Sequence, residues 1–318
     1  MLTVLLLVVG LALLLGGAEF LVKGAASLAT RLGVSPFLIG LTLVGFGTSS
    51  PELVASLEGA FQGYPGIAVG NVVGSNIANI LLILGLAGLI FPMTCDRDAL
   101  RRDGGMMLIA AFAMVAVCVY GLLSREIGLG FLALLAVYLV YTYRADRKGQ
   151  DGAGALHAAE ADFLTKTGPA TYVLVEVVMA LGGLVALVAG ASLLVDSAVE
   201  IATRFGVSDS VIGLTLVAIG TSLPEVATSV LAAFRRQSGI AIGNVVGSNI
   251  FNVLGIAGVV AVVKPIAVPA DIAAFDIWVM AAATVLFLVF AWTGARIGRG
   301  EALLLLAGYA AYVTFLLH

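Results

Sequence analysis

The chain has 318 residues, of which 61% are hydrophobic and only 11% are charged, and its mean hydropathy is +1.13. Soluble globular domains contain about 25% charged residues, so this composition excludes them and indicates a protein with many membrane spans. The net charge of −3 excludes nothing further, because orientation in a membrane depends on where Lys and Arg lie rather than on their sum.

Apolar runs follow one another along nearly the whole chain. A helix needs about 20 apolar residues to cross roughly 30 Å of hydrocarbon. This criterion predicts ten spans, near residues 2–30, 34–60, 66–91, 105–123, 127–143, 171–202, 208–233, 239–263, 272–294 and 301–317. The first run lacks a basic leader and continues past the length of a signal peptide, so we interpret it as an uncleaved span. Cys95 and Cys118 have no metal-binding spacing, and we expect no disulfide between them.

The segment 144–170 differs from the spans because charged residues occur there among glycine and alanine. This composition is typical of a solvated linker, here predicted to be cytoplasmic and to join two units, 1–143 and 171–318. The second unit repeats the first at an offset of 173 residues: 40–57 resembles 213–230, and 70–77 recurs unchanged at 243–250. Each unit has an odd number of spans, so the second enters the membrane from the opposite side. The predicted fold is an all-α polytopic membrane protein with ten transmembrane helices in two inverted five-helix repeats.

The placement of basic residues indicates the orientation. With the N-terminus outside, 13 of the 16 Lys and Arg residues fall in cytoplasmic loops and span ends, and only Arg125, Arg204 and Lys264 fall outside. Cytoplasmic loops are enriched in Lys and Arg. We therefore predict a multi-pass protein of the cell (inner) membrane with both termini on the non-cytoplasmic side.

Two carboxylates, Glu52 and Glu225, occupy matched positions inside apolar spans. A charge at that depth costs at least a few kcal/mol and is by default a functional-site hypothesis. Pro51 and Pro224 precede them, and a proline opens the helix and frees backbone carbonyls. Broken backbone is tolerated at membrane depth only where it is buried in protein or lines a polar cavity. Thr48 and Ser49 lie four and three residues before Glu52, on the same helical face, and the second copy repeats this pattern with Thr221 and Ser222.

The third span has a stripe of small polar residues one helical turn apart, Asn71, Ser75 and Asn79, and the eighth span repeats it with Asn244, Ser248 and Asn252. Carboxylates with hydroxyl, amide and carbonyl oxygens form a ligand set for calcium or sodium rather than zinc or copper. Two glutamates also offset one divalent ion or a comparable load of monovalent ions. Close helix packing is the competing interpretation of the serines and of Gly74 and Gly247. Asn76 and Asn249 lie off the stripe, where they can cap or bond backbone, and are left out of the ligand set.

The remaining charges within the spans are interpreted as peripheral. Four lie toward span ends and can reach the interface: Glu19, Lys23, Asp196 and Glu200. Glu176 and Asp276 are interpreted as near-surface charges, and Glu58 as marking the outer mouth of the site.

The motifs at 47–52 and 220–225, each followed by Gly-Asn-Val-Val-Gly-Ser-Asn-Ile, resemble the paired repeats of the cation/calcium exchanger superfamily, in its prokaryotic sodium/calcium exchanger branch. The resemblance covers essentially the whole chain. It implies that the second, third, seventh and eighth spans meet around several sodium sites and one calcium site, and that the long first and sixth spans slide against them. It also implies a ligand set of Glu52 and Glu225 for calcium and sodium, the carbonyls of Thr48 and Thr221 for calcium, the carbonyls of Gly45 and Ala218 and the oxygens of Ser49, Ser222, Ser75 and Ser248 for sodium, and Asn79 and Asn252 lining the centre.

Two departures bear on the driving ion. Several relatives, including those that use potassium, carry Asp where this chain has Asn252, and proton/calcium exchangers typically carry Glu in spans that here contain no acidic residue. The resemblance therefore favours sodium coupling.

The predicted function is antiport of calcium against sodium by alternating access, with calcium, sodium and the lipid bilayer as partners and with no cofactor, nucleic acid or protein partner. Proton/calcium antiport is the first alternative. A cation channel with a glutamate ring is a second, although inverted repeats within one chain are typical of alternating access. An enzyme is disfavoured, because no nucleophile with its base, metal-binding histidine cluster or cofactor motif accompanies the glutamates.

Overall fold

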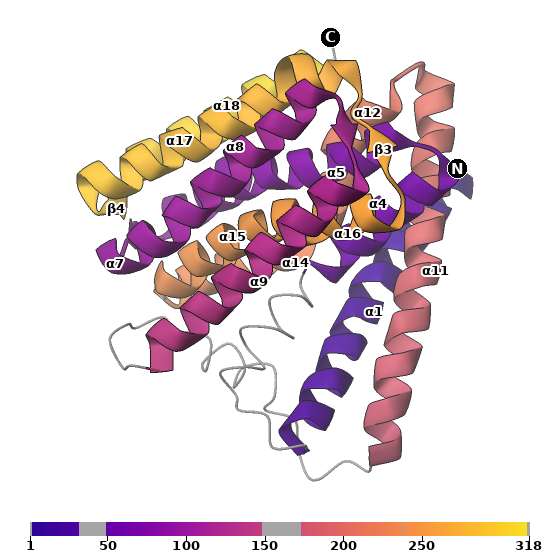
Figure 1. Ribbon diagram of the computed structural model, residues 1–318, viewed down its shortest axis with the longest axis horizontal. Helices are drawn as coiled ribbons and strands as arrows, with labels where there is room; N and C mark the ends of the chain where they lie inside the picture. The colour runs from indigo at the N-terminus through magenta and orange to yellow at the C-terminus, as the bar shows by residue number, and fades with distance from the viewer. Residues whose placement is uncertain (1, 32–48, 148–172, 237, 317–318) are drawn as a thin grey trace.

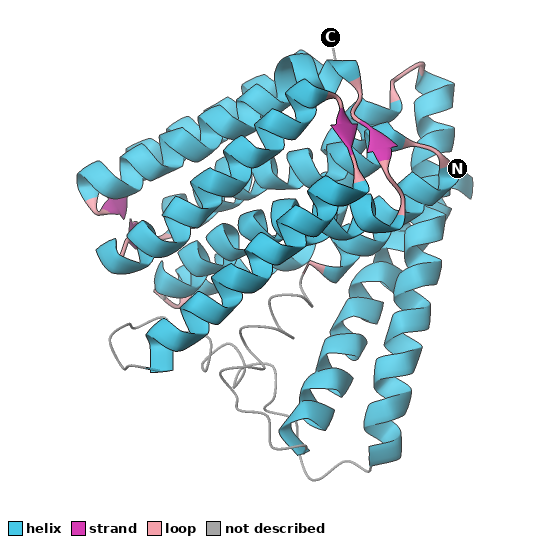
Figure 2. Ribbon diagram, viewed as in Figure 1, coloured by secondary structure: helices cyan, strands magenta, loops and turns pink. Residues whose placement is uncertain are grey.

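The computed structural model describes residues 2–31, 49–147, 173–236 and 238–316, and nearly all of them are helical (Figure 2). The first half contains α1 (Leu2–Arg31), α4 (Ser50–Gln62), α5 (Pro65–Ile77), η2 (Ala78–Ile83), α6 (Leu84–Ile90), α7 (Arg97–Ala99), η3 (Leu100–Gly104), α8 (Gly105–Tyr120) and α9 (Arg125–Arg147). The second half contains α11 (Val173–Phe205), α12 (Asp209–Ile212), η4 (Gly213–Val217), α13 (Ala218–Thr221), α14 (Leu223–Phe234), α15 (Ser238–Phe251), η5 (Asn252–Ala257), α16 (Gly258–Val263), η6 (Ile272–Asp276), α17 (Ile277–Gly294) and α18 (Arg299–Leu316).

Seven helices or continuous helical runs among the described residues are long and apolar enough to cross a membrane: Leu2–Ala25, Pro65–Ile90, Arg97–Tyr120, Arg125–Arg144, Val173–Phe205, Ser238–Val263 and Ile272–Gly294. An eighth candidate is the pair Asp209–Thr221 and Leu223–Phe234, which is bent by 50°. All of them coincide with predicted spans. Of the second predicted span, 34–60, only the part from residue 49 is described. The protein is therefore a helical polytopic membrane protein, and the total of ten spans stays a prediction.

Two small antiparallel sheets connect the halves of the chain. β1 (Met93–Thr94) pairs with β4 (Arg296–Ile297), and β2 (Leu122–Leu123) pairs with β3 (Ile266–Ala267). Each sheet therefore joins a loop of the first half to a loop of the second. They lie at opposite ends of the helical body (Figure 1).

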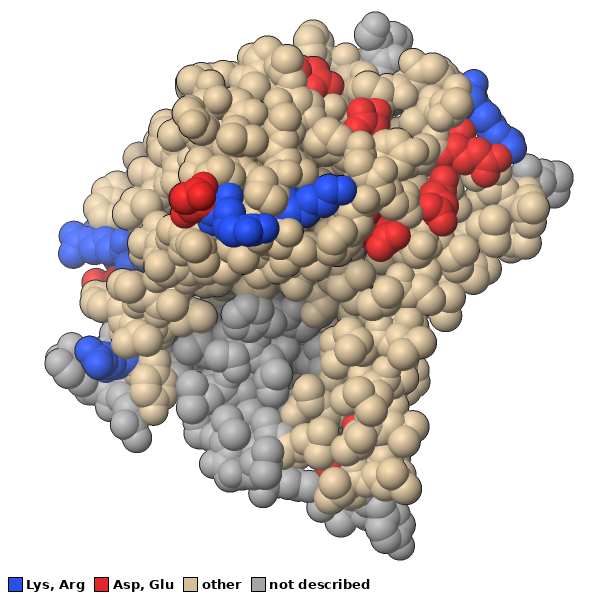
Figure 3. Space-filling view, turned by 45° about the vertical axis from the view of Figure 1, so that its right-hand side comes forward, with Lys and Arg blue, Asp and Glu red and all other residues tan. Residues whose placement is uncertain are grey.

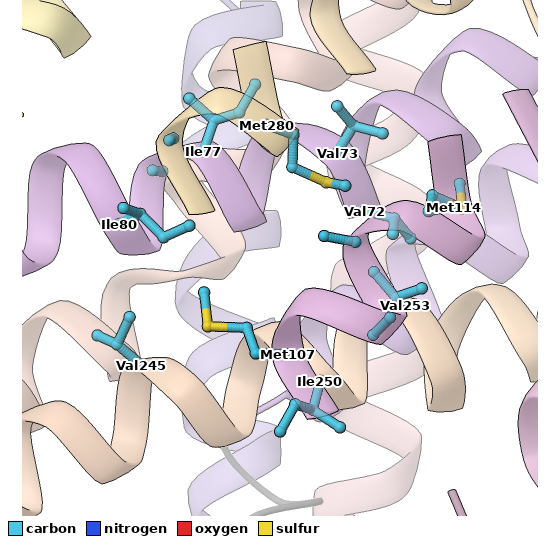
Figure 4. Close-up of a cluster of buried hydrophobic side chains, with 14 of the residues drawn as sticks. Val72, Val73, Ile77, Ile80, Met107, Met114, Val245, Ile250, Val253 and Met280 are labelled. Atoms are coloured by element: carbon cyan, nitrogen blue, oxygen red, sulfur yellow. The ribbon is translucent and has the colours of Figure 1, made fainter. Parts of the chain in front are cut away.

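Two central helical runs form the buried middle of the molecule: α5–η2–α6, and α15–η5–α16. In their most apolar stretches 78% and 83% of the residues are buried inside the protein. The π-helical segments η2 and η5 widen both runs at matching places. Side chains from both runs and from the flanking α8 and α17 form one apolar cluster, which includes Val73, Ile77, Val253, Met107 and Met280 (Figure 4).

The helices α1 and α11 lie side by side and apart from this middle (Figure 1). They have 30 and 33 residues, as expected for long first and sixth spans, and at 1.5 Å per residue each exceeds the bilayer core. Only 22% of the most apolar stretch of each is buried. The lower right of Figure 3, where this pair runs, is nearly free of charged side chains, as a surface in contact with lipid requires.

The α1–α11 contact depends on glycine. A Cβ atom on Gly17 would lie 2.5 Å from the backbone N of Leu187, and one on Gly183 would lie 2.4 Å from the N of Leu21. Separations under 3 Å leave no room for a side chain, so the two backbones touch directly. This is the close approach that small residues allow between membrane helices.

The predicted linker, 144–170, lies largely outside the described residues. Its first part is helical, because α9 continues to Arg147. The division into units 1–143 and 171–318 stays a prediction. Both cysteines are free and buried, so the expectation of no disulfide is confirmed.

Candidate functional site

The two glutamates lie in the first turn of α4 and α14. α4 begins at Ser50 and α14 at Leu223, and each has its proline at the start, where the missing N–H costs no hydrogen bond. Ser49 and Ser222, just before these helices, have matching backbone angles of φ −91°, ψ 9° and φ −81°, ψ 8°. Because a helix N-terminus carries partial positive charge, this position favours a carboxylate.

The two halves of the chain exchange hydrogen bonds at these carboxylates. Ser222 Oγ donates to Glu52 Oε1 at 2.9 Å, and Ser49 Oγ donates to Glu225 Oε1 at 3.2 Å. Glu52 is 1% exposed and Glu225 0%. The structure therefore brings together Glu52, Glu225, Ser49 and Ser222, four of the residues predicted as ligands.

The remaining predicted ligands do not make the same contacts in the two halves. Ser248 Oγ donates to Glu225 Oε1 at 3.4 Å, whereas Ser75 Oγ donates to Asn71 Oδ1 at 3.5 Å. The single hydroxyl proton of Thr221 has more than one acceptor within reach, Asn71 Oδ1 at 3.1 Å and backbone carbonyls that include that of Ala218 at 3.3 Å. The Ala218 carbonyl also accepts from the Ser222 amide at 3.1 Å. Thr48 and Gly45 lie outside the described residues.

Four further residues support the glutamates and were not in the predicted ligand set. Asn71 Nδ2 donates to the Glu52 carbonyl at 3.0 Å and to Ser56 Oγ at 2.9 Å. In the second half Asn244 Nδ2 donates to the Glu225 carbonyl at 3.2 Å and to Ser229 Oγ at 2.9 Å. The serines follow their glutamates by one helical turn in both copies, and this repeated spacing was the signal available in the sequence.

Asn79 and Asn252 lie in the middle of the central runs, near and at the start of the π-helical segments η2 and η5. Both are 1% exposed. Asn79 Nδ2 donates to Asn249 Oδ1 at 2.9 Å, and Asn252 Nδ2 donates to Asn76 Oδ1 at 3.1 Å. The expectation that Asn76 and Asn249 bond backbone is met, and each also contacts a central asparagine of the other half.

The site contains buried oxygen atoms of the kind that bind cations. Three of them have no hydrogen-bond partner among the described residues: Glu52 Oε2, Asn79 Oδ1 and Asn252 Oδ1. Buried polar atoms are normally partnered, and carboxylate and amide oxygens are the ligands that hard cations prefer. Among the described residues, no three or more His, Cys, Asp and Glu side chains lie close enough together to hold a metal ion by themselves. A cation at this position would therefore be held by hydroxyl and amide oxygens as well as by carboxylates.

The charges interpreted as peripheral differ in their exposure. Lys23 Nζ donates to Glu19 Oε1 at 2.5 Å, both partly exposed, and Glu200 pairs with Arg204 near the end of α11. The interpretation of Glu176 and Asp276 as near-surface charges is wrong, because they are 1% and 3% exposed. Neighbouring helices cover them: Ser27 of α1 donates to Glu176 at 2.6 Å, and Tyr312 of α18 donates to Asp276 at 2.9 Å.

Known proteins are similar to this chain over nearly its whole length. The family model for sodium/calcium exchanger proteins matches residues 2–144 and 175–318. The inner membrane protein YrbG of Escherichia coli is 35% identical over 318 residues, covering 98% of this chain and 95% of YrbG. The sodium/calcium exchanger MaX1 of Methanosarcina acetivorans is 36% identical over 348 residues, covering 99% and 98%.

A solved structure of the sodium-calcium exchanger NCX_Mj, soaked with 2.5 mM Na⁺ and 0.1 mM Ca²⁺, has a TM-score of 0.63 and 33% identity, covering 99% of this chain and 98% of NCX_Mj. The solved structure and the family model therefore indicate the same family and fold. The chain is thus a member of the sodium/calcium exchanger family, whose members are ion transporters rather than enzymes.

Proposed function

We propose that the chain is a secondary active antiporter that exchanges calcium for sodium, by alternating access to one mid-membrane site built on Glu52 and Glu225. Family membership and the similarity to proteins named as sodium/calcium exchangers support this proposal. The observation that carries it is the crossed contact at the centre, where each glutamate accepts a hydrogen bond from the serine next to the other glutamate.

Charge balance explains why such a site exchanges one kind of cation for another. Two buried carboxylates without a cation would have to cross the membrane as unpaired charges, which is costly. One calcium ion, or several sodium ions, offsets that charge and lets the site change its facing. The empty site stays where it is, so calcium moves one way only when sodium moves the other.

The proposed topology is that of the sequence prediction, with ten spans in two inverted repeats and both termini outside the cytoplasm. The distribution of arginines supports it. Arg296 lies in β4, and Arg97 and Arg299 lie within three residues of the β1–β4 sheet. The guanidinium of Arg236 lies 5.7 Å from the ring centre of Phe91, which precedes β1 by two residues. This basic end would face the cytoplasm.

Sodium is the proposed driving ion. The central runs carry the amides of Asn79 and Asn252 where a carboxylate would provide a group for protons to titrate. The similarity to NCX_Mj, whose structure was soaked with sodium and calcium, points the same way.

Reconstituted vesicles test the proposal. The purified protein is placed in liposomes loaded with sodium and diluted into sodium-free buffer that contains calcium, and calcium entry is followed with a fluorescent indicator. Vesicles loaded with lithium, potassium or acidic buffer serve as controls. We expect calcium entry only with internal sodium. We also expect faster entry when the inside of the vesicles is made positive, because exchange of more than two sodium ions for one calcium moves net positive charge outward.

Three results would contradict the proposal in different ways. Entry driven by a pH gradient would replace sodium by protons as the driving ion. Entry without any internal counter-ion would indicate a channel. A calcium flux that does not depend on the membrane potential would argue against exchange of more than two sodium ions for one calcium.

A further inference from the structure

Four buried asparagines connect the two central helical runs. Asn79 and Asn252 belong to the proposed cation site, whereas Asn76 and Asn249 were not in the predicted ligand set. The latter two are each 3% exposed, one turn before the former, and contact the opposite run. An amide buried at this depth needs a reason to be there, because it costs free energy unless it is hydrogen-bonded.

The direction of the hydrogen bonds can be followed outward from the backbone. Asn249 Nδ2 lies 3.4 Å from the backbone carbonyl of Asn76. A carbonyl oxygen only accepts hydrogen bonds, so the amide of Asn249 must present its nitrogen there. Its oxygen then faces Asn79, whose Nδ2 donates to it at 2.9 Å.

We call this pair of hydrogen bonds, from a backbone carbonyl through one asparagine to the next, a relay. A second relay runs in the opposite direction, with the roles of the two halves exchanged. Asn76 Nδ2 lies 3.5 Å from the backbone carbonyl of Asn249, and also 3.5 Å from Sδ of Met280. Asn76 Oδ1 consequently accepts from Asn252 Nδ2, at 3.1 Å. In both relays a backbone carbonyl of one repeat sets the orientation of an amide in the other.

The relays leave two oxygen atoms free. Oδ1 of Asn79 and Oδ1 of Asn252 are buried and have no hydrogen-bond partner among the described residues. Each residue lies one turn after a stripe serine, Ser75 or Ser248, and Ser248 donates to Glu225. The free oxygens therefore belong to the helical faces that carry the cation site.

The orientation of such an amide matters because its two ends are alike in size but opposite in polarity. A carboxamide can turn over with little steric cost, since its oxygen and nitrogen are nearly the same size. Turned over, Asn79 or Asn252 would present N–H donors, which repel a cation, in place of an oxygen that binds it.

On the basis of the proposed exchange site, we propose that Asn76 and Asn249 are positioning residues for cation binding. Each holds the central asparagine of the other repeat, Asn252 or Asn79, with its oxygen toward the cation and its nitrogen away. Because the relays cross between repeats, a displacement of one central run against the other loosens both amide ligands together. The two halves of the site are thereby coupled.

Calcium binding to the purified full-length protein in detergent tests this role without relying on transport. Equilibrium binding of radioactive calcium is measured for Asn249→Ala and for the control Thr284→Ala, whose buried hydroxyl donates only within its own helix, to the Met280 carbonyl at 2.9 Å. We expect affinity about tenfold weaker in Asn249→Ala, the scale of one lost hydrogen-bonded ligand, and about unchanged in Thr284→Ala. Thermal unfolding and gel filtration establish that both variants are folded.

A rescue separates orientation from packing. In Asn79→Asp both side-chain termini are oxygens, so no wrong orientation exists. Adding Asn249→Ala to Asn79→Asp should change calcium affinity less than about twofold. A loss as large as in the wild-type background would overturn the proposal, because a packing defect would persist. The mirror pair, Asn76→Ala with Asn252→Asp, gives the same test if one alanine variant does not fold.

The crossed pattern provides a second check. Double-mutant cycles should give strong coupling for the pairs 249 with 79 and 76 with 252, and additivity for 76 with 79 and 249 with 252. Strong coupling within one run instead of between runs would overturn the relay. If wild-type protein binds no calcium, the proposed function itself fails; if it binds calcium and Asn249→Ala binds equally well, only the positioning role fails.

Discussion

The central helical runs and the α1–α11 pair are both built from apolar helices, yet they are held together in different ways. The central runs exchange side-chain hydrogen bonds between the two halves of the chain, such as that from Asn79 to Asn249 at 2.9 Å. The α1–α11 pair is held mainly by backbone contact, with Gly17 and Gly183 leaving no room for a side chain between the helices. The first contact is directional, whereas the second is made mainly by glycine faces, apart from the hydrogen bond from Ser27 to Glu176.

The difference indicates that the two regions have different roles in exchange. Satisfied buried hydrogen bonds specify one arrangement of the groups that make them. Glycine faces fix how far apart two helices lie but place few directional limits on how they move. We therefore expect cation affinity to depend on the central runs, and the rate of exchange to depend on the outer pair.

The largest expected effect is at the central carboxylates. Glu52→Gln or Glu225→Gln keeps the side-chain size but removes a charge that the proposed cargo needs, and should reduce sodium-driven calcium uptake by at least about 100-fold. The control is Glu19→Gln in α1, because the Glu19 carboxylate is exposed and pairs with Lys23 of the same helix. Normal uptake in Glu52→Gln would remove the glutamates from the site.

The next effect would break the α1–α11 contact without touching the central runs. Gly183→Leu places a side chain where a Cβ would already lie 2.4 Å from the backbone N of Leu21. Overpacking of this kind typically costs 1–3 kcal/mol. We expect exchange about tenfold slower and calcium affinity within about twofold of wild type, measured by flux and by equilibrium binding.

Gly182→Leu is the control for that variant, because nothing lies within 4 Å of a Cβ at Gly182. It should leave both flux and binding unchanged. An equal loss of calcium affinity in Gly183→Leu would show that affinity and access are not divided between the two regions.

A smaller effect compares the two halves of the centre. Asn71 is 0% exposed and bonds Glu52, Ser56, Ser75 and Thr221, whereas Asn244 is partly exposed and bonds Glu225 and Ser229. Leucine at either position leaves polar partners unsatisfied. The midpoint temperature of thermal unfolding should fall by about 5–8 °C for Asn71→Leu and by about 2–3 °C for Asn244→Leu. Equal shifts would mean that the extra contacts of Asn71 add nothing to stability.

The smallest effect concerns thiol reactivity at the end of the central body. Burial, with a smaller contribution from the Glu301 carboxylate, raises the pKa of the Cys95 thiol to about 11. At pH 7.5 fewer than about one thiol in a thousand is ionised. Maleimide should therefore label Cys95 only after denaturation, as followed by mass spectrometry; rapid labelling of folded protein would show that this end of the body opens.

The sequence by itself determined the class of protein, most of the helices and the residues at the centre. Hydropathy needs only local information, and the described helices coincide with predicted spans. The duplication identified Glu52 and Glu225 as a pair, because a charge repeated at matching positions in apolar spans has no structural advantage. Spacing also assigned Ser49 and Ser75 to faces of their own helices.

Only the tertiary structure decided which face meets which. Helical periodicity says nothing about a partner 170 or more residues away, so the crossing of Ser49 to Glu225 and of Ser222 to Glu52 could not be predicted. The burial of Glu176 and Asp276 escaped the sequence for the same reason, since Ser27 and Tyr312 on neighbouring helices cover them. The orientation of Asn79 and Asn252 depends on the side-chain amides of Asn249 and Asn76 in the opposite repeat, and these come within reach only once the helices have packed.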